Sequence, residues 1–414
     1  MSRVRTSLTD EPRPASPAAA ERSVETAFQR VFAPHLAQAG GARFVGAWRK
    51  TLRLLRPLGA ASQENRVRVL ADGDQVFEDM WAAIASASRA VLLNTYILEP
   101  DRVGERTLLE LERAAARGCR VLLALDAFGS HRVSAARLDV LRAAGVRVQL
   151  FNPVVRWSSP LSRLVRDHRK ILVVDERVAF CGGLNFAEEY AGERHGTGLF
   201  RDTQLALEGP CARDLAQLIE PQGRAAPAAA RKEGALVLIL ESHVRRQRRA
   251  IQKALRTMLG RALVHCHLTS PYFVPPPRLV RALVHAARRG VDVRVLTSGR
   301  SDVPLVRLAS QHLYGRLLRR GVRIFELDAR VLHAKTVTVD GVFASVGSFN
   351  LDYWSDRRNL EVLVGVLDRQ AAGLVEEQFQ RDLAGAREIE LASWQNRGWP
   401  RRLLHWTAYL LLSM

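Results

Sequence analysis

Two stretches of the chain, DHRKILVVDERVAFCGGLN at residues 167–185 and LHAKTVTVDGVFASVGSFN at residues 332–350, repeat one pattern of polar residues. Each stretch contains His-x-Lys-x4-Asp, followed by a turn of small residues and an Asn. The copies are offset by 165 residues at every shared position: His168 and His333, Lys170 and Lys335, Asp175 and Asp340, and Asn185 and Asn350. A repeat this regular indicates a duplicated domain.

Similar secondary-structure patterns surround both copies. Before the first copy, β-branched apolar runs at 88–101 and 119–130 alternate with amphipathic segments that end on Gly. Before the second copy, runs at 260–275 and 291–302 alternate with helical segments in the same way. Alternation of short strands and amphipathic helices is typical of a layered α/β fold. We therefore predict an α/β protein built from two tandem domains.

The motif itself indicates chemistry. Residues i and i+2 of a strand point to one face, so His168 lies beside Lys170 and His333 beside Lys335. The chain has only five lysines, at positions 50, 170, 232, 253 and 335, against 57 arginines, and two of the five belong to the motif. A compact ammonium is not interchangeable with a guanidinium. Small residues in the turn, Ser348 among them, would let backbone donors approach an anion.

The composition limits the class of protein. The 414 residues are 47% hydrophobic and 25% charged, as in a globular protein of two or three domains. A net charge of +20 predicts a polyanionic partner, either nucleic acid or an anionic membrane. No apolar stretch approaches the ~20 residues of a membrane span, and the first residues lack a secretory h-region. The four cysteines show no pairing pattern and are interpreted as reduced cytosolic thiols.

Composition also suggests boundaries. Residues 1–60 are expected to form a flexible basic leader with one amphipathic helix near Ala47–Leu58. The first domain is placed at 61–222, an Ala- and Pro-rich linker at 223–234 and the second domain at 235–390. Residues 391–414 combine Trp, Tyr, Leu and Arg, which is typical of a helix at a membrane surface, although a helix packed on the domain has the same pattern.

The motifs resemble those of the phospholipase D superfamily, and within it the bacterial cardiolipin synthases, particularly the short type without N-terminal transmembrane helices. The resemblance extends over Asn65–Leu367 and includes SPYFVP at 270–275, SDVPLVRLAS at 301–310 and VGSFNLDYWS at 346–355. Two departures are Asn94, where an acidic residue is expected, and Pro276, where Asp is common.

The resemblance implies two phospholipase D-like α/β sandwich domains with pseudo-twofold symmetry and one shared active site. It implies His168 as nucleophile through a phosphohistidine, and His333 as general acid and base. Phosphate oxygens would be held by Lys170, Lys335, Asn185, Asn350 and Ser348, with Asp202 and Glu361 orienting the histidines. Asp175 and Asp340 are assigned to the catalytic motif, with a structural turn role as the alternative.

The implied function is transfer of a phosphatidyl group from one phosphatidylglycerol to another, with release of glycerol. The expected partners are anionic phospholipid and the cytoplasmic face of the cell membrane, with peripheral attachment and no nucleic acid; the sequence gives no oligomeric state. No cofactor or metal is expected, and His265 and His267 are interpreted as packing residues. The alternatives are hydrolysis of phospholipids, phosphodiester cleavage of nucleic acid, and non-catalytic binding of anionic lipid.

Overall fold

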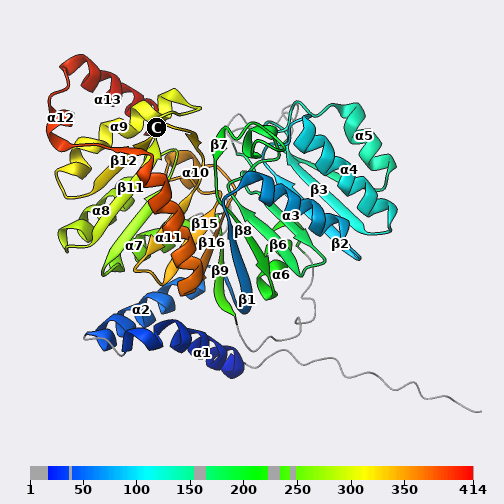
Figure 1. Ribbon diagram of the computed structural model, residues 1–414, viewed down its shortest axis with the longest axis horizontal. Coiled ribbons are helices and arrows are strands. Elements are labelled where there is room, and N and C mark those ends of the chain that lie inside the picture. Colours follow the sequence, from blue (N-terminus) through cyan, green and yellow to red (C-terminus); the bar gives the residue numbers. More distant parts are fainter. Residues whose placement is uncertain (1–16, 37–39, 153–164, 222–233, 243–248, 414) are drawn as a thin grey trace, which may run out of the picture.

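A computed structural model describes residues 17–36, 40–152, 165–221, 234–242 and 249–413 (Figure 1). Its centre is one continuous sheet of fifteen strands, with helices on both faces. The predicted linker at 223–234 lies almost entirely outside the described residues. The predicted α/β class with two repeats is confirmed, and joining of the repeats into a single sheet is an addition that the sequence did not indicate.

The strand order is the same in both halves, counted outward from the middle of the sheet. The first half runs β1 (Ala60–Leu70), β8 (Gln204–Glu208), β6 (Val178–Gly182), β5 (Ile171–Val174), β2 (Ala90–Thr95), β3 (Arg120–Asp126) and β4 (Arg147–Phe151). The second half runs β9 (Ala235–Ser242), β16 (Glu361–Leu367), β15 (Phe343–Gly347), β14 (Thr336–Val339), β10 (His265–Thr269), β11 (Asp292–Ser298) and β12 (Arg323–Leu327), with β17 (Ala386–Glu388) added at the edge. The halves are joined where β1 pairs antiparallel with β9.

Helices follow the same duplication. One face of the first half is covered by α3 (Gly73–Ala85), α4 (Arg102–Ala116) and α5 (Ala135–Ala143), and the other by α6 (Pro210–Ile219). The equivalent helices of the second half are α7 (Ala250–Arg261), α8 (Pro277–Arg288) and α9 (Pro304–Leu318) on one face and α11 (Arg369–Ala384) on the other. Buried side chains on both faces explain why the central strands are apolar without interruption.

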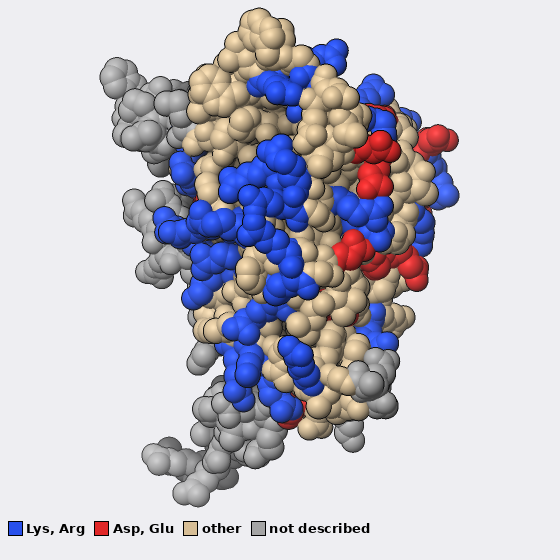
Figure 2. Space-filling model, turned by 90° about the vertical axis from the view of Figure 1, so that its left-hand side faces the viewer, with Lys and Arg blue, Asp and Glu red and all other residues tan. Residues whose placement is uncertain are grey.

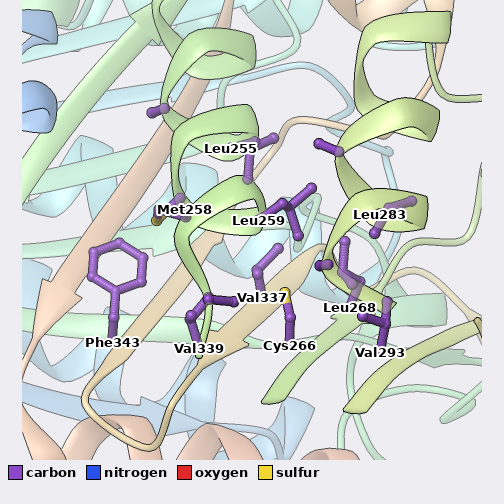
Figure 3. Close-up of a cluster of buried hydrophobic side chains, with 14 of the residues drawn as sticks. Leu255, Met258, Leu259, Cys266, Leu268, Leu283, Val293, Val337, Val339 and Phe343 are labelled. Atoms are coloured by element: carbon purple, nitrogen blue, oxygen red, sulfur yellow. The ribbon is translucent and has the colours of Figure 1, made fainter. Parts of the chain in front are cut away.

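The second-half core illustrates the packing (Figure 3). Cys266 and Leu268 alternate along β10 and point toward Leu255 and Leu259 of α7 and Leu283 of α8. A different core lies on the opposite face and contains buried residues of both halves, including Ile171 and Val173 of β5 and Val346 of β15. The two repeats therefore share apolar surface as well as backbone hydrogen bonds, and they form one structural unit.

The N-terminal segment differs from the expected flexible leader. Within it, α1 (Pro17–Leu36) and α2 (Gly41–Leu55) are followed by a short 3₁₀ turn, Arg56–Leu58. Val45, Trp48, Leu52 and Leu55 recur at helical spacing on one side of α2 and are buried in the second-half core. The prediction of a flexible leader is corrected for residues 17–58, because this apolar stripe has a packing partner that local composition does not reveal.

The C-terminal segment contains α12 (Leu391–Gln395) and α13 (Trp399–Ser413), and α13 packs on α9 through the buried residues His405 and Ala408. Within the described ranges, no helix has both the length and the apolar character needed to cross a bilayer. All four cysteines are buried and none is in a disulfide.

Replacing Trp48 with Ala should lower the free energy of unfolding by about 3–5 kcal/mol, because it removes a buried indole from a packed core. Trp48 is 3% exposed, stacks on Phe343 and donates a hydrogen bond to Asp340 Oδ2 at 3.0 Å. Urea unfolding followed by circular dichroism measures the change.

The matched control is Trp399→Ala, because that indole is 74% exposed. It should change stability by less than about 0.5 kcal/mol. Equal effects of the two substitutions would contradict the packing of α2 described above.

Candidate active site

Just before its strand begins, each motif makes a backbone hydrogen bond to the opposite half. The His168 amide donates to Leu360 O at 3.0 Å, immediately before β16, and the His333 amide donates to Arg201 O at 2.8 Å, in β7 (Phe200–Arg201). The residue after each acceptor carries a carboxylate, Glu361 in one case and Asp202 in the other. The backbone pairing therefore delivers a carboxylate from one half to the histidine of the other half.

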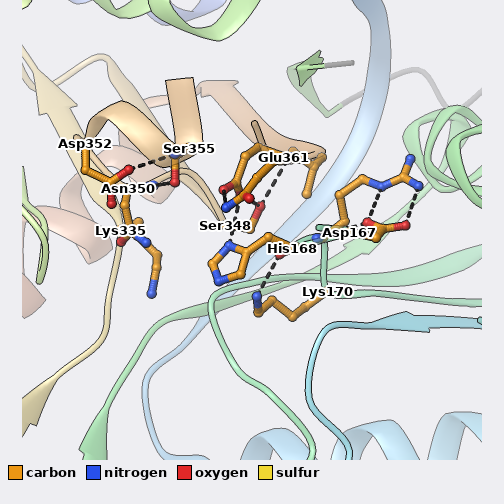
Figure 4. A network of polar contacts seen from close by, with 12 residues as sticks. Asp167, His168, Lys170, Lys335, Ser348, Asn350, Asp352, Ser355 and Glu361 are labelled. Carbon is orange, nitrogen blue, oxygen red and sulfur yellow. Dashed lines mark hydrogen bonds and ion pairs between the residues drawn. The ribbon is translucent and has the colours of Figure 1, made fainter. Parts of the chain in front are cut away.

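The two imidazole–carboxylate pairs are both formed. His168 Nδ1 lies 3.1 Å from Glu361 Oε2, and His333 Nδ1 lies 2.6 Å from Asp202 Oδ2 (Figure 4 shows the first pair). A carboxylate at Nδ1 fixes the tautomer with its proton on that nitrogen, which leaves Nε2 with a free lone pair. The two carboxylates in contact with the histidines are those to which the family resemblance assigned this position, Asp202 and Glu361.

Both lysines are buried next to the histidines, and their ammonium groups point into the same space (Figure 4). Lys170 Nζ donates to His168 O at 2.7 Å, and Lys335 Nζ donates to His333 O. Burial lowers the pKa of Lys170 to about 7 and that of Lys335 to about 8. A bound anion between these nitrogens would favour their charged forms again.

Burial, together with the neighbouring Lys charges, also lowers the pKa of both histidines, and that of His333 falls to about 4. Glu361 and Asp202 oppose this effect. Burial alone would raise the pKa of the two carboxyls, but the adjacent His and Lys charges outweigh it and hold both below their ordinary values. At neutral pH the site without substrate contains two neutral imidazoles and two carboxylates.

The small residues after each motif make room for the carboxylates. A Cβ on Gly183 would lie 2.3 Å from Asp202 Oδ1, so only Gly fits there. The equivalent residue of the second copy is Ser348, which donates its hydroxyl hydrogen to Glu361 and accepts from Val362 N at 3.1 Å. The prediction that Ser348 supports phosphate differs from this placement, because its hydroxyl is engaged by the orienting carboxylate.

The two asparagines are not equivalent. Asn185 donates to the Tyr190 hydroxyl at 2.8 Å and accepts from Ile97 N at 3.3 Å, so its amide holds neighbouring loops. Asn350 is 3% exposed and its Oδ1 has no hydrogen-bond partner among the described residues. This oxygen is an acceptor, so Asn350 could hold a phosphate oxygen only through its Nδ2 amide.

Asp175 and Asp340 lie at the far ends of β5 and β14, away from the histidines. Asp175 accepts from the amides of Ser88, Arg89 and Ala90. Asp340 accepts from the amides of 263–265 and from the Trp48 indole. Their assignment to catalysis is corrected: both have positive φ and anchor a turn to the start of a neighbouring strand.

Aromatic rings enclose the site, and sequence reasoning missed them. Tyr96 meets His168 edge-on at 4.9 Å between ring centroids, and Tyr190 meets His333 at 5.1 Å. Phe200 contacts His333 from a further direction, at 5.5 Å. The rings cover the imidazoles and contribute to their burial. None of the three residues belongs to a longer periodic segment, so the sequence carries no signal of this role.

A second polar cluster lies on β10, under α11. Ligand-type atoms of His265, His267 and Glu376 lie within 4.8 Å of one another. His267 Nδ1 is 2.7 Å from Glu376 Oε1, and the His267 ring stacks on Phe379 at 4.9 Å. Nε2 of His265 has no hydrogen-bond partner among the described residues, so the interpretation of the two histidines as packing residues stays a prediction.

Comparison with known proteins matches the geometry. The family model described as cardiolipin synthase, PLD-like domain, matches residues 80–205 and 255–383. The chain belongs to this family. Cardiolipin synthase A of Pseudomonas fluorescens is 34% identical over 82% of the chain and 73% of its own length. A cardiolipin synthase of Geobacillus kaustophilus is 31% identical over 88% of the chain and 75% of its own length.

A solved structure shows the same fold. The phosphatidylserine synthase of Haemophilus influenzae superposes with a TM-score of 0.69, covering 88% of this chain and 99% of its own, at 12% identity. The expected membership of the phospholipase D-like cardiolipin synthases is confirmed, together with the two-repeat α/β fold.

Two positions depart from the pattern expected of cardiolipin synthases. Asn94 is buried and donates to Asp167 Oδ2 at 2.9 Å, and Asp167 in turn pairs with Arg169 at 2.7 Å. Arg169 also contacts Glu241 of the second half at 3.1 Å, so this network links the halves behind the motif. Pro276 occupies the N-cap of α8, where Asp would cap the helix with its side chain.

The segments SPYFVP and SDVPLVRLAS meet in the structure. The Tyr272 hydroxyl donates to Asp302 Oδ2 at 2.6 Å. Asp302 also acts electrostatically on Lys335, raising its pKa against the effect of burial. The two segments, which the resemblance marked without a role, therefore form part of the wall beside the second motif.

Because the chain has only five lysines, the unusual pKa values can be measured directly. With ¹³Cε-labelled lysine, we expect two NMR signals to titrate between about pH 6 and 9, the lower near 7 and the higher near 8. Desolvation disfavours the ammonium, so each lysine loses its proton at lower pH than a solvated one.

Lys170→Met should remove the first of these signals and Lys335→Met the second. Lys253→Met, on exposed α7 surface, is the matched control and should leave both signals in place. A spectrum without any lysine titration below pH 9 would contradict the burial of the two ammonium groups.

Proposed function

We propose that the protein makes cardiolipin by transferring a phosphatidyl group from one phosphatidylglycerol to the glycerol hydroxyl of a second. The observation that carries this proposal is the meeting of two carboxylate-oriented histidines and two buried lysines in one site, in a chain of the cardiolipin synthase family. A nucleophile and an acid–base group on opposite sides of one phosphorus suit a two-step displacement.

In the first step, Nε2 of His168 attacks the phosphorus of the donor lipid. A P–N bond forms, the P–O bond to the glycerol headgroup breaks, and the leaving oxygen takes a proton from Nε2 of His333, which releases glycerol. Glu361 stabilises the positive charge that develops on His168, as Asp202 does for protonated His333. The anionic phosphodiester favours protonation of His333 before the step, which offsets the effect of burial.

In the second step, the glycerol hydroxyl of another phosphatidylglycerol attacks the phosphohistidine. Its proton passes to His333, the P–N bond breaks, and cardiolipin leaves with His168 restored. We assign the non-bridging oxygens to Lys170, Lys335 and the Nδ2 amide of Asn350, which would donate hydrogen bonds to them through both steps. Water in place of the second lipid would give phosphatidic acid, so exclusion of water by the aromatic wall favours transfer.

Replacing either histidine with Asn should lower cardiolipin formation from labelled phosphatidylglycerol by about 10³-fold or more, because nucleophilic or acid–base catalysis is lost. Alkaline quenching should trap an acid-labile labelled protein in the wild type. His168→Asn should form none, whereas His333→Asn should form it slowly, since only proton transfer to the leaving group is missing.

Asp175→Asn is the matched control, because that carboxylate anchors a turn away from the histidines. It should reduce stability more than turnover. Labelling of His168→Asn but not of His333→Asn would reverse the two roles. Nicked DNA with no cardiolipin, in parallel incubations of the wild type, would overturn the proposed substrate class.

We also propose that α13 contacts the membrane. Its exposed side includes Trp399, Leu403, Leu404 and Leu411, whereas His405 and Ala408 face α9. A helix with aromatic and leucine side chains on one side and arginines at its start suits the boundary between headgroups and acyl chains. The interpretation of 391–414 as a packed helix applies to the side of α13 that faces α9, and we assign the membrane interpretation to its exposed side. Attachment on the cytoplasmic face stays a prediction.

The triple substitution Trp399→Ser, Leu403→Ser, Leu411→Ser should reduce flotation with phosphatidylglycerol vesicles by about tenfold or more, because exposed apolar area is lost. Deleting 395–414 would also expose the surface of α9, so point substitutions are the better test. The control replaces Leu109, Val140 and Leu150 of the first half, which are also exposed, with Ser. Equal flotation of both triple variants would contradict a specific contact through α13.

A further inference from the structure

Arginines gather on the outer surface of α7, α8 and α9. Figure 2 shows basic side chains in a band down this face, with the acidic side chains gathered at its edge. The band includes six arginines that line two adjoining hollows, and we call them the arginine face: Arg256, Arg278, Arg281, Arg288, Arg316 and Arg320. All six are exposed. All six lie on the side of the second half that faces away from the first half.

The arginine face gathers six guanidinium groups around shared hollows without carboxylate partners in the described part of the chain. Among the described residues, none of its six guanidinium groups is within ion-pair distance of a carboxylate. Some exposed arginines elsewhere are paired, such as Arg102 with Glu188 at 2.8 Å and Arg323 with Glu388 at 2.8 Å. Unneutralised like charges repel one another, so six of them on one face favour a polyanion as occupant.

The spacing concentrates these charges. Arg278, Arg281 and Arg288 lie at i, i+3 and i+10 of α8 and so share one side of the helix. Arg256 reaches the same hollow from α7 and Arg316 from α9. Gly260 of α7 lines the hollow too, and a Cβ there would meet no atom within 4 Å, so the floor stays open.

The arginine face extends between the neighbourhood of the candidate active site and α13, the two regions with a proposed role in lipid binding. Arg278 and Arg281 also line a second hollow of about 730 Å³ with Tyr353, Arg357 and other residues near α10 (Tyr353–Arg357), which begins three residues after Asn350. At its other end, Arg316 lines a third hollow with Leu403 and Trp406 of α13. Basic surface therefore extends from the neighbourhood of the candidate active site to the apolar edge of the molecule.

We propose that the arginine face is the surface on which the protein lies on a bilayer rich in anionic phospholipid. Planar guanidinium groups bind phosphate in bidentate fashion, and each basic residue near an anionic surface adds to the attraction. The exposed apolar residues of α13 favour a bilayer over nucleic acid, since a polynucleotide backbone offers them no apolar phase. The proposal deepens the proposed function and takes the phospholipid substrate class from it.

The test is flotation of the full chain with vesicles of equal parts phosphatidylglycerol and phosphatidylcholine, and with phosphatidylcholine alone. Arg278→Gln, Arg281→Gln, Arg288→Gln together should weaken partition onto the anionic vesicles by on the order of a hundredfold at low salt. Wild-type partition should fall as salt rises from 50 to 500 mM, because screening shortens the range of the attraction.

The matched control removes three exposed arginines from the opposite end of the sheet, as Arg89→Gln, Arg117→Gln, Arg142→Gln. The same net charge is lost, so this variant should partition within about threefold of the wild type if position matters. Equal loss in both triple variants, or wild-type binding to phosphatidylcholine alone that is as strong, would overturn the proposal. So would a duplex oligonucleotide that displaces the wild type from vesicles and binds the α8 variant less tightly.

Failure of the proposed function is distinguishable from failure of this inference. His168→Asn should float like the wild type, because docking does not require the reaction. A wild type that floats through the α8 arginines but forms no cardiolipin would refute the activity and leave the docking surface standing. Thermal unfolding of every variant shows whether lost flotation reflects a lost fold.

Discussion

The pairing of each motif histidine with a carboxylate from the other half is the constraint on which the site depends. Neither motif histidine has its carboxylate partner in its own half, since Glu361 contacts His168 and Asp202 contacts His333. Contacts that hold the two halves together therefore also fix the orientation of the two histidines. The β1–β9 pairing, the shared apolar core and the contact of Arg169 with Glu241 all have this effect.

The two motifs share the same pattern of polar residues, but the residues around their histidines differ. Gly183 leaves space for Asp202, whereas Ser348 at the equivalent position donates a hydrogen bond to Glu361. Asn185 is tied to Tyr190, whereas Asn350 keeps an unpaired oxygen. A two-step reaction needs one histidine as nucleophile and the other as proton carrier, and these neighbours give the two imidazoles different surroundings.

Much of this arrangement could be predicted from the sequence, because the repeat is covalent and regular. His168, Lys170, His333 and Lys335 follow from the motif, and Asp202 and Glu361 from the family pattern. What failed depended on long-range contacts. The apolar stripe of α2 packs against residues of the folded second half, which are distant in sequence. The motif does not show which end of its strand faces the site, so it does not reveal that Asp175 and Asp340 lie at the far end. Tyr96 directly follows β2, Tyr190 ends a short 3₁₀ turn and Phe200 lies in the two-residue strand β7, so no periodic pattern marks their rings.

The position of α2 has a consequence for biosynthesis. Trp48 and its hydrogen-bond partner Asp340 are 292 residues apart in the chain. At 5–20 residues per second, the indole waits roughly 15–60 s on the ribosome before that partner is synthesised. During this interval the apolar stripe of α2 is exposed to water and to other nascent chains. Closure of the second half over α2 therefore has to follow synthesis of Asp340, and this long separation in sequence raises the contact order of the fold.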